Sequence, residues 1–512
     1  MKVEITAAAP LQLQASQMAV PVFEEDLEDG LRGLAAEIDR KLGGHLAAAA
    51  RGENFEGKPD SSLTLPTLGR LPAGRVTLLG LGRRQEALRS FAATGFETLR
   101  MAAGTAARAA RKSGGGRMAV VIPGALGRAS AAARAAVEGV LLGAYRFDRY
   151  RTEKRPSDAL AGLTVAVPAG QERSGEVKAA VALARSMADA VSWARDLVNE
   201  PPLECTPSRL AAAARDLARE AGLACEVRGP REIAGLRMGM FLGVTRGSAE
   251  EPRLVRLSLV PRGAGAKRRP LLLVGKAITF DSGGLSLKPT ESMVDMKTDM
   301  AGAAAVLAAM RVVASNPPSF PVHALVGACE NMPGGRAYKP SDVLRACNGK
   351  TVEVTNTDAE GRLVLGDLLA WGVEAFRPAA AIDVATLTSA CVVALGHFTA
   401  GAFGLDGPVI DGVLAAARAS GEDVWRLPLV APVRETLKSE VADLKNTGER
   451  WGGAISAAHF LKEFVGDVPW AHLDIAGPSS SGKERGYVPK GGTGFGVRTL
   501  VEFVRTFEGP RP

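Results

Sequence analysis

The sequence predicts an α/β protein in which a smaller N-terminal α/β domain is joined by a helix to a larger C-terminal domain, whose mixed central sheet is covered by helices. Three observations support this fold class. The chain has 512 residues, more than the roughly 250 to 300 at which a single hydrophobic core stops growing. Short apolar runs alternate with stretches of helical period in both halves. A long amphipathic stretch between the halves ends at the adjacent Pro201 and Pro202.

The expected N-terminal domain covers residues 1–172 and has the α/β pattern of a macro-like domain. Its alanine-rich stretch Phe91–Ala110 has a helical period, and three apolar runs predict strands: Arg75–Leu79, Met118–Ile122 and Leu163–Val167. The turn Gly80–Gly82 lacks the GxGxxG spacing and the later acidic residue of a dinucleotide site. Loop glycines are therefore the better interpretation, and this domain carries no recognisable chemistry.

Residues 173–198 are expected to form the linker helix, because the amphipathic pattern of Glu176–Val198 stops at the two prolines, which cannot continue a helix. The larger domain then covers residues 199–512. Its apolar runs predict strands at Arg253–Val260, Pro270–Gly275, Pro321–Cys329, Thr351–Thr355 and Ala380–Ala385. Between them lie segments of helical period, such as Ala301–Val313 and Arg362–Phe376. This order predicts a mixed sheet with helices on its faces.

The composition is that of an ordinary packed protein, with 46% hydrophobic and 23% charged residues, rather than that of a disordered or fibrous one. Apolar runs such as Ala379–Leu387 are shorter than the roughly 18 residues of a membrane span, and the N-terminus lacks a signal-peptide pattern. We therefore expect a cytoplasmic protein without a membrane partner. The five cysteines are scattered and never spaced CxxC, so they indicate neither a disulfide framework nor a thiolate zinc site.

Two segments concentrate charged residues where predicted strands give way to loops, namely Gly275–Asp299 and Asn356–Leu363. Loops beyond the carboxyl ends of strands form the ligand crevice of open α/β sheets, so the two segments are expected to converge there. Together they supply four carboxylates: Asp281, Asp299, Asp358 and Glu360. Four converging carboxylates would repel one another, and two divalent cations would remove that repulsion. The sequence therefore predicts a dinuclear metal site.

The alternative is that each carboxylate caps a helix or pairs with a lysine. For the four together the metal site is the stronger interpretation. Asp281 is followed by Ser282-Gly283-Gly284, whose backbone can fold tightly around an ion. Asp358 and Glu360 precede the helix expected near Arg362. An anion at that helix start would be favoured by the free N–H groups and by the guanidinium.

Three segments, VGKAITFDSGG, KTDMAGAAAVL and NTDAEGRLVL, are similar to the signature segments of the leucyl aminopeptidase (M17) family, and the similarity extends from about Asp196 to Val501. The resemblance implies a metal-dependent aminopeptidase that removes the N-terminal residue of peptides, leucine and other mostly apolar residues, through a water activated by two metal ions. By position it implies five metal ligands: Lys276, Asp281, Asp299, Asp358 and Glu360. It also implies two catalytic side chains, Lys288 and Arg362.

The cofactors implied by the resemblance are two divalent ions per chain, Mn²⁺ or Zn²⁺, and a bicarbonate held by Arg362 as general base. Lys288 would place its ammonium on the oxygen that becomes negative. Lys276 is an unusual ligand, because an amine with an ordinary pKa of about 10.4 must lose its proton to bind a metal. The ion near Lys276 and Asp299 would also bind the free amino group of the peptide. The implied pocket for the first side chain comprises Met296, Thr386, Leu387 and Ser389.

Three positions depart from the family pattern, because Ala277, Ser341 and Ser389 stand where glycine is usual. Ser389 adjoins the expected pocket, so the preference for the first side chain is the property that this change would affect. The resemblance further implies a homohexamer whose catalytic domains are gathered inside.

Two other functions compete with the peptidase. A DNA-binding regulator is suggested by relatives that bind DNA and by the basic cluster Arg108, Arg111, Lys112 and Arg117, but a solvated helix end explains these residues more simply and nucleic acid is not the expected partner. A catalytically silent structural relative would be expected to have lost ligands, whereas all are present. Structural roles are expected for the isolated histidines, which form no HExxH motif: His45, His323, His397, His459 and His472.

Overall fold

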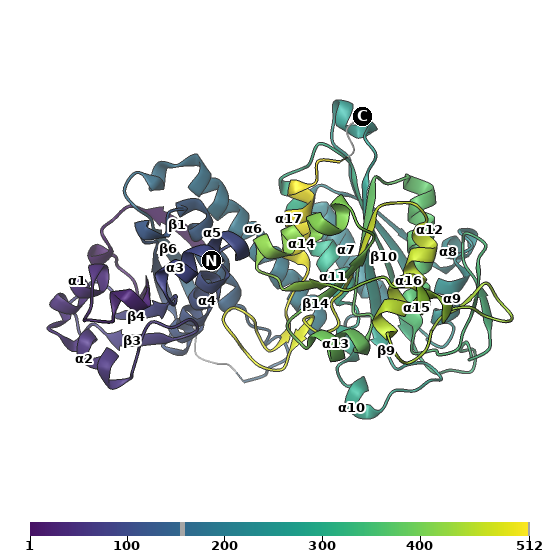
Figure 1. The fold of residues 1–512 in the computed structure, drawn as a ribbon, viewed down its shortest axis with the longest axis horizontal. Helices are drawn as coiled ribbons and strands as arrows, with labels where there is room; N and C mark the ends of the chain where they lie inside the picture. Colours follow the sequence, from purple (N-terminus) through teal and green to yellow (C-terminus); the bar gives the residue numbers. More distant parts are fainter. Residues whose placement is uncertain (154–158, 510–512) are drawn as a thin grey trace. The chain divides into compact units, whose positions relative to one another are not determined.

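The computed structural model describes residues 1–153 and 159–509, and it confirms the α/β fold class (Figure 1). The chain divides into two compact units. The first comprises Met1–Ser192 together with a short segment from the C-terminal half, Gly482–Lys490. The second contains the rest of the described chain. The helix α6 (Gly175–Asn199) spans the division at Ser192 and ends just before the two prolines, as the sequence predicts.

The first unit is built on a six-stranded sheet in the order β1-β6-β5-β2-β4-β3, in which only β3 runs antiparallel to its neighbour. Its strands are β1 (Lys2–Thr6), β2 (Gln17–Val22), β3 (Ser62–Pro66), β4 (Arg75–Gly80), β5 (Gly116–Val121) and β6 (Leu160–Ala166). Its other helices are α1 (Gly33–Leu42), α2 (His45–Gly52), α3 (Arg84–Thr94), α4 (Glu97–Lys112) and α5 (Ala129–Gly143). The predicted single helix over Phe91–Ala110 is wrong, because the backbone at Gly95 and Phe96 turns left-handed, with φ of 57° and 64°. A right-handed helix cannot continue through two such residues.

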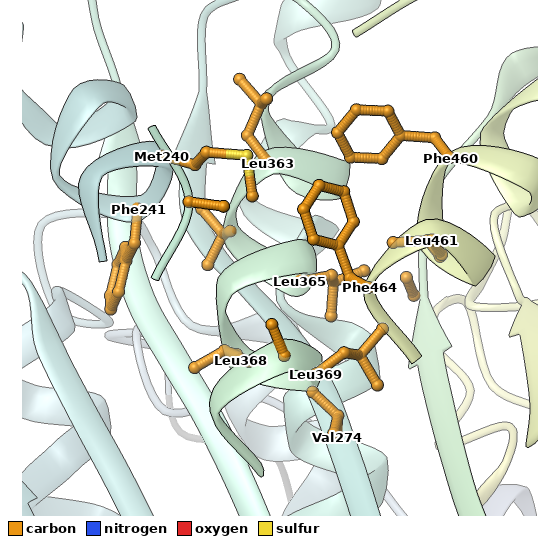
Figure 2. Packing of buried hydrophobic residues seen from close by; sticks show 14 of the residues in the cluster. Met240, Phe241, Val274, Leu363, Leu365, Leu368, Leu369, Phe460, Leu461 and Phe464 are labelled. Carbon is orange, nitrogen blue, oxygen red and sulfur yellow. The ribbon is translucent and has the colours of Figure 1, made fainter. Parts of the chain in front are cut away.

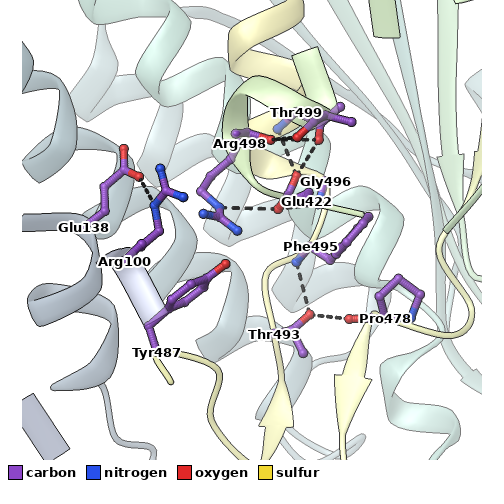
Figure 3. A network of polar contacts seen from close by, with 12 residues as sticks. Arg100, Glu138, Glu422, Pro478, Tyr487, Thr493, Phe495, Gly496, Arg498 and Thr499 are labelled. Carbon is purple, nitrogen blue, oxygen red and sulfur yellow. Dashed lines mark hydrogen bonds and ion pairs between the residues drawn. The ribbon is translucent and has the colours of Figure 1, made fainter. Parts of the chain in front are cut away.

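The segment Gly482–Lys490 packs on α4 within the first unit. The Tyr487 hydroxyl donates to Oε1 of Glu97 at 2.8 Å, and the Arg108 guanidinium donates to the carbonyl of Gly486. Nearby, the buried Arg100 donates to Oε2 of Glu138 at 2.7 Å (Figure 3). Arg108 of the basic cluster is therefore engaged in internal packing.

The second unit contains an eight-stranded mixed sheet in the order β15-β14-β17-β13-β9-β10-β8-β7. The four central strands β17, β13, β9 and β10 are parallel, whereas β14, β8 and β7 each pair antiparallel with the strand on their inner side. The bounds are β7 (Ala224–Arg228), β8 (Arg253–Leu259), β9 (Leu271–Asp281), β10 (Val322–Asn331), β13 (Ala380–Ala385), β14 (Ala400–Gly404), β15 (Val424–Arg426) and β17 (Trp470–Asp474).

Two smaller sheets accompany the large one. The first contains β11 (Val343–Arg345), β12 (Thr351–Glu353) and β16 (Leu444–Lys445), and the second contains β18 (Ser480–Ser481) and β19 (Gly491–Gly492). The predicted strand Thr351–Thr355 therefore exists in a shortened form, and it belongs to the three-stranded sheet instead of the central one. The predicted strand Pro270–Gly275 is too short, because β9 continues to Asp281. Lys276 consequently lies inside a strand and not in a loop.

Helices cover both faces of the large sheet (Figure 1). One face is covered by α7 (Pro207–Ala221), α11 (Ala301–Ser315), α14 (Pro408–Ser420) and α17 (Val497–Thr506). The other is covered by α9 (Gly239–Thr245), α12 (Glu360–Phe376) and α16 (Gly453–Val465). Shorter helices are α8 (Pro230–Gly235), α10 (Thr290–Met293), α13 (Ser389–Leu395) and α15 (Ala431–Glu435). The buried carboxylate of Glu422 caps α17 by accepting from the backbone N–H groups of Gly496 and Thr499 at 3.0 and 2.9 Å (Figure 3).

A hydrophobic core of the second unit lies between β9 and the helices α9, α12 and α16. Phe241 of α9, Val274 of β9, Leu365 of α12 and Phe460 of α16 are all fully buried in it (Figure 2). The stretch Thr290–Ser315 is long and apolar enough to cross a membrane by length and composition alone, but 78% of its most apolar part is buried inside the protein. The buried core helix of a globular protein has the same length and apolar composition.

Candidate active site

The site lies where the parallel central strands of the second unit end. Asp281, Asn331 and Asp474 are the last residues of β9, β10 and β17, and Thr386 follows the last residue of β13. Parallel strands bring their carboxyl ends to one edge of a sheet, and this edge is where open α/β proteins bind ligands. Local sequence supplies the polar residues, and the strand pairing brings them together.

Three of the predicted carboxylates meet at this edge. Asp281, Asp358 and Glu360 each offer an oxygen, and the three oxygens lie within 4.8 Å of one another. Asp281 is held by its own turn, because the backbone N–H of Gly283 donates to its Oδ1 at 2.8 Å. The backbone N–H of Asp358 donates to Oδ1 of Asn356 at 2.8 Å, which fixes the loop just before α12 begins at Glu360.

Lys276 reaches the same cluster from inside β9. Side chains alternate between the faces of a strand, so Gly275 faces α11 while Lys276 faces the start of α12. A Cβ atom added at Gly361 would lie 2.4 Å from Cε of Lys276, so a side chain at this position would displace the end of the lysine from its present place. Its Nζ lies 2.8 Å from Oδ1 of Asp299 and 2.9 Å from Oε1 of Glu360. The fourth predicted carboxylate is thereby joined to the other three.

Lys288 lies opposite Lys276, in the loop that follows β9. Its Nζ is 2.9 Å from Oδ2 of Asp281 and 2.5 Å from Oδ1 of Asp358. Its side chain is 15% exposed, whereas that of Lys276 is 4% exposed. Lys288 is therefore the cation of the cluster that a molecule arriving from solvent can reach.

The electrostatics match a site that needs additional positive charge. Burial, followed by repulsion from Asp281, raises the pKa of Glu360 to about 8. Burial raises the pKa of Asp299 to about 6, although Lys276 opposes the shift. For Lys276 itself, burial lowers the pKa, but attraction to Asp299 and Glu360 outweighs burial and leaves it above its usual range. Glu360 and Asp299 thus hold protons more tightly than ordinary acids.

Two carboxylate oxygens point to a cation as the missing partner. Within the described chain, Oδ2 of Asp299 and Oε2 of Glu360 are buried and accept no hydrogen bond. Buried carboxylate oxygens normally have donors, and divalent cations bind such oxygens directly. The donor set of four carboxylates and one amine therefore fits the divalent ions that the sequence predicts.

Arg362 lies in the first turn of α12 and is 7% exposed. Its guanidinium donates to the carbonyl of Asn446 at 2.9 Å, and among the described residues its Nε has no partner although it is buried. Burial lowers the pKa of Arg362 to about 10, against the attraction of Glu360 and Asp474. Arg362 is therefore a buried cation with unused hydrogen-bond capacity beside the cluster.

The predicted pocket residues have different positions. The Thr386 hydroxyl donates to Oδ1 of Asp299 at 2.7 Å, so this residue contacts the cluster. The carbonyl of Met296 accepts from the backbone N–H of Asp299 at 3.3 Å. Leu387 is partly buried beyond β13, and Ser389 is exposed at the start of α13. Only Thr386 is thus joined to the carboxylates by its own side chain.

Sequence reasoning missed two buried residues that support the carboxylates. Nδ2 of Asn331 donates to Oδ1 of Asp281 and to the carbonyl of Thr357, at 2.8 and 2.9 Å. Asn331 and Asp281 are direct partners in the pairing of β10 with β9. The sequence feature that could have revealed this pair is that a polar residue ends each of the two buried apolar runs. The second residue, Asp474, ends β17 in the same way.

Three of the five histidines have partners outside the carboxylate cluster. Nδ1 of His472 lies 2.6 Å from Oδ1 of Asp383, and Nδ1 of His323 lies 2.8 Å from the Ser258 hydroxyl. Nε2 of His459 lies 3.0 Å from the carbonyl of Val430. The structural roles expected for these three agree with those contacts. Among the departures from the family pattern, Ala277 is fully buried and Ser341 adopts φ of 75°.

The fold and the site define a two-unit α/β protein with a carboxylate cluster suited to divalent cations at the carboxyl edge of a mixed sheet. The catalytic-domain model of the cytosol aminopeptidase family (Peptidase_M17) matches residues 192–501, and the N-terminal-domain model of the same family matches residues 19–154. The chain therefore belongs to the cytosol aminopeptidase family, as a hydrolase of the leucyl aminopeptidase type.

Relatives and solved structures agree with this assignment. A probable cytosol aminopeptidase of Geobacter sp. (strain M21) is 44% identical, over 99% of this chain and 100% of the relative. A probable cytosol aminopeptidase of Aquifex aeolicus (strain VF5) is 41% identical, over 96% of this chain and 95% of the relative. The solved structure of a mutant tomato leucine aminopeptidase has a TM-score of 0.87, with 35% identity over 98% of this chain and 96% of its own. The bottromycin maturation enzyme BotP in complex with Mn has a TM-score of 0.82, with 37% identity over 96% and 100%.

Proposed function

We propose that this aminopeptidase releases the N-terminal residue of peptides, with leucine and other mostly apolar residues preferred, by a reaction that depends on two divalent ions. One observation carries the proposal: four carboxylates, three of them buried, share one cluster, and two of the buried oxygens accept no hydrogen bond within the described chain. Bound Mn²⁺ or Zn²⁺ would polarise the scissile carbonyl and lower the pKa of the attacking water. The complex of the similar BotP with Mn supports manganese.

The proposed ligands are the five residues that the resemblance implies: Lys276, Asp281, Asp299, Asp358 and Glu360. Lys276 now supplies positive charge to the cluster, with its Nζ between Asp299 and Glu360. To act as a ligand it must lose a proton, and the charge of a divalent ion favours that loss. The lysine therefore holds the carboxylates together in the metal-free protein and, once deprotonated, would offer its lone pair to a bound ion.

Lys288 is proposed to stabilise the oxygen that becomes negative when water adds to the scissile carbonyl. Its ammonium is the more accessible cation of the cluster. Burial lowers the pKa of Lys288, but attraction to the three nearby carboxylates outweighs burial and leaves the pKa above the usual range, so the side chain stays charged. A charge placed in advance at the developing oxyanion lowers the barrier without stabilising the substrate equally.

Arg362 is proposed to bind a bicarbonate ion and to orient it as the acceptor of the water proton. Its first-turn position in α12 adds free backbone N–H groups, which favour an anion. The buried Nε without a partner among the described residues leaves the guanidinium able to donate to a bound anion. The alternative is that Arg362 only organises the loop through the carbonyl of Asn446.

Recognition of the substrate is proposed to use its free amino group near Lys276 and Asp299. Met296, Thr386, Leu387 and Ser389 are proposed to line the pocket for the first side chain. An acetylated peptide lacks the basic amine and should bind poorly. The preference for the first side chain is where Ser389, in place of the usual glycine, is expected to differ from relatives.

The domain boundaries at residues 172 and 198, a cytoplasmic location and a homohexamer remain part of the proposal, supported by the resemblance to the family. We propose that the N-terminal domain serves assembly, because every proposed catalytic residue follows Pro202. Deletion of residues 1–170 should disturb the oligomer first, and sedimentation would test this. A truncated chain that still sediments as a hexamer would contradict the role.

The central experiment compares leucyl amide substrates with free and acetylated amino groups, before and after chelation. Free substrate should be hydrolysed and acetylated substrate should not, and a chelator should abolish the activity until Mn²⁺ or Zn²⁺ is added. The matched variants Asp358→Ala and Glu360→Ala should lose activity with the metal. Full turnover by metal-free protein, or full activity of either variant, would contradict the two-ion proposal.

A further inference from the structure

Asp474 is a fully buried carboxylate to which the proposed function gives no role. It ends β17, and both of its oxygens are used. Oδ1 accepts from the backbone N–H of Leu387 at 3.1 Å and from that of Ala476 at 3.2 Å. Oδ2 accepts from the Thr388 hydroxyl at 2.6 Å. Two of the three donors belong to one loop, which leaves β13 and enters α13.

This loop also contacts the carboxylate cluster. The carbonyl of Thr386 accepts from Nζ of Lys276 at 2.9 Å, and the hydroxyl of Thr386 donates to Oδ1 of Asp299 at 2.7 Å. Thr386 is therefore next to Leu387, which Asp474 holds, and in contact with two proposed ligands. A shift of the loop by a fraction of an ångström would move both contacts together.

Asp474 also orients the start of α13. The Thr388 hydroxyl donates to Asp474 and, with its own oxygen, accepts from the backbone N–H of Cys391 at 3.0 Å. On the other side, the backbone N–H of Ile475 donates to the carbonyl of Ala385 at 2.8 Å. The segment from Ala385 to Thr388 is thus tied to the end of β17 at both of its ends, and the carboxylate provides the side-chain contacts of that tie.

We propose that Asp474 is a positioning residue, which holds the loop Thr386-Leu387-Thr388 so that Thr386 fixes Lys276 and Asp299 in the geometry needed for one of the two metal ions. The inference rests on the proposed function for the identity of the ligands. It adds that occupancy of the Lys276 and Asp299 side of the cluster depends on a carboxylate that contacts neither residue directly.

The test is calorimetric titration of chelator-treated full-length protein with Mn²⁺. In Asp474→Ala one of the two binding events should weaken by about 10-fold or more, the range seen when outer partners of metal ligands are removed. The other event, on the side of Asp281 and Asp358, should change little. Asp474→Asn should restore most of the affinity, because its oxygen can accept from Leu387 and its amide can donate to Thr388.

A second pair of variants keeps the test decisive if Asp474→Ala does not fold. Thr388→Val removes the hydrogen bond from the Thr388 hydroxyl to Asp474 and should weaken the same Mn²⁺-binding event. Thr388→Ser keeps the hydroxyl and should leave that event unchanged. The matched control is Asp367→Ala, since Asp367 is equally buried and accepts from the backbone N–H groups of Phe241 and Cys347 at 2.9 and 2.8 Å. It should lose stability without weakening either event.

The outcomes separate the inference from the proposed function. Wild-type protein that binds no Mn²⁺ would overturn both. Wild-type protein that binds two ions, with both events unchanged in Asp474→Ala and Thr388→Val, would overturn the positioning role alone. Equal weakening of both events, or the same weakening in Asp367→Ala, would show a merely structural role and would also overturn it.

Discussion

The Nζ of Lys276 lies 2.8 Å from Oδ1 of Asp299, and both side chains are almost completely removed from water. A buried ion pair of this kind is costly to break by removing one partner, because the other charge is left uncompensated. The same lysine also contacts Glu360. In the metal-free protein it therefore supplies the counter-charge that keeps the carboxylates close.

Binding of Mn²⁺ should consequently release protons and strengthen as the pH rises from 6 to 9. The pKa of Glu360 is raised to about 8 and that of Asp299 to about 6, and the pKa of Lys276 lies above the usual range of a lysine. Each of these groups retains a proton at low pH that the metal must displace, so affinity should rise by about tenfold per pH unit for each proton released. Calorimetry in buffers of different ionisation enthalpy would count the protons. Affinity independent of pH would contradict this assignment of ligands.

Replacing Lys288 with alanine should lower kcat by roughly 10² to 10³ while KM changes little, because its proposed contact strengthens only as the oxyanion forms. Steady-state kinetics on a leucyl amide and metal analysis of the same preparation would check this. The metal content should stay near that of the wild type. Loss of metal, or a change in KM alone, would instead make Lys288 a ligand or a binding residue.

Arg362→Ala should keep its metal ions but lose roughly 10² to 10⁴ in kcat, as expected when a general base is no longer positioned. In carbonate-free buffer, added bicarbonate should raise the activity of the wild type and leave the variant unchanged. If Arg362 only organises the loop through Asn446, the variant should be unstable or poor in metal, and the wild type should ignore bicarbonate.

His323 should make the protein less stable at mildly acidic pH. Burial, with a smaller contribution from Arg256, lowers its pKa from 6.5 to about 4. Its stabilising effect is complete above pH 6.5 and is lost as the pH falls towards 4, because the unfolded chain takes up the proton first. Between pH 7.5 and 5 the wild type should lose about 1 to 2 kcal/mol more than His323→Phe, after allowance for partial exposure of the ring. Thermal unfolding of both proteins at both pH values would test this, and an equal loss of stability in the two would show that the pKa of His323 is not lowered.

Ser341→Gly should stabilise the protein by about 0.5 to 1 kcal/mol. A side chain in the left-handed region costs about 1 to 2 kcal/mol, and removing it is partly offset because glycine increases the conformational entropy of the unfolded chain. The residue has φ of 75° and its side chain is exposed, so little packing is lost. The melting temperature would report the change. Ser341→Ala is the matched control and should be neutral, because it keeps the Cβ atom that causes the strain.

The sequence by itself determined the fold class and the chemical identity of the cluster. Residues Ala380–Ala385 form a strand as predicted, and α6 follows the amphipathic span Glu176–Val198 to within a residue at each end. These elements depend on local hydrophobic periodicity and on the positions of prolines, and both features can be recognised within a short window of sequence. The expectation that Asp281, Asp358 and Glu360 converge was met. Only Asp281 ends a parallel strand of the large sheet, however, because Asp358 and Glu360 follow β12 of the three-stranded sheet.

Only the tertiary structure decided how the ligands are held. The break at Phe96, the extension of β9 through Lys276, and the support from Asn331 and Asp474 all escaped sequence reasoning. Lys276 and Glu360 are far apart in the chain, and their contact depends on Gly361 leaving room for the lysine. Such contacts arise from the pairing and packing of segments that are distant in the sequence. They leave no trace in the hydrophobic periodicity of either segment, so a short window of sequence cannot predict them.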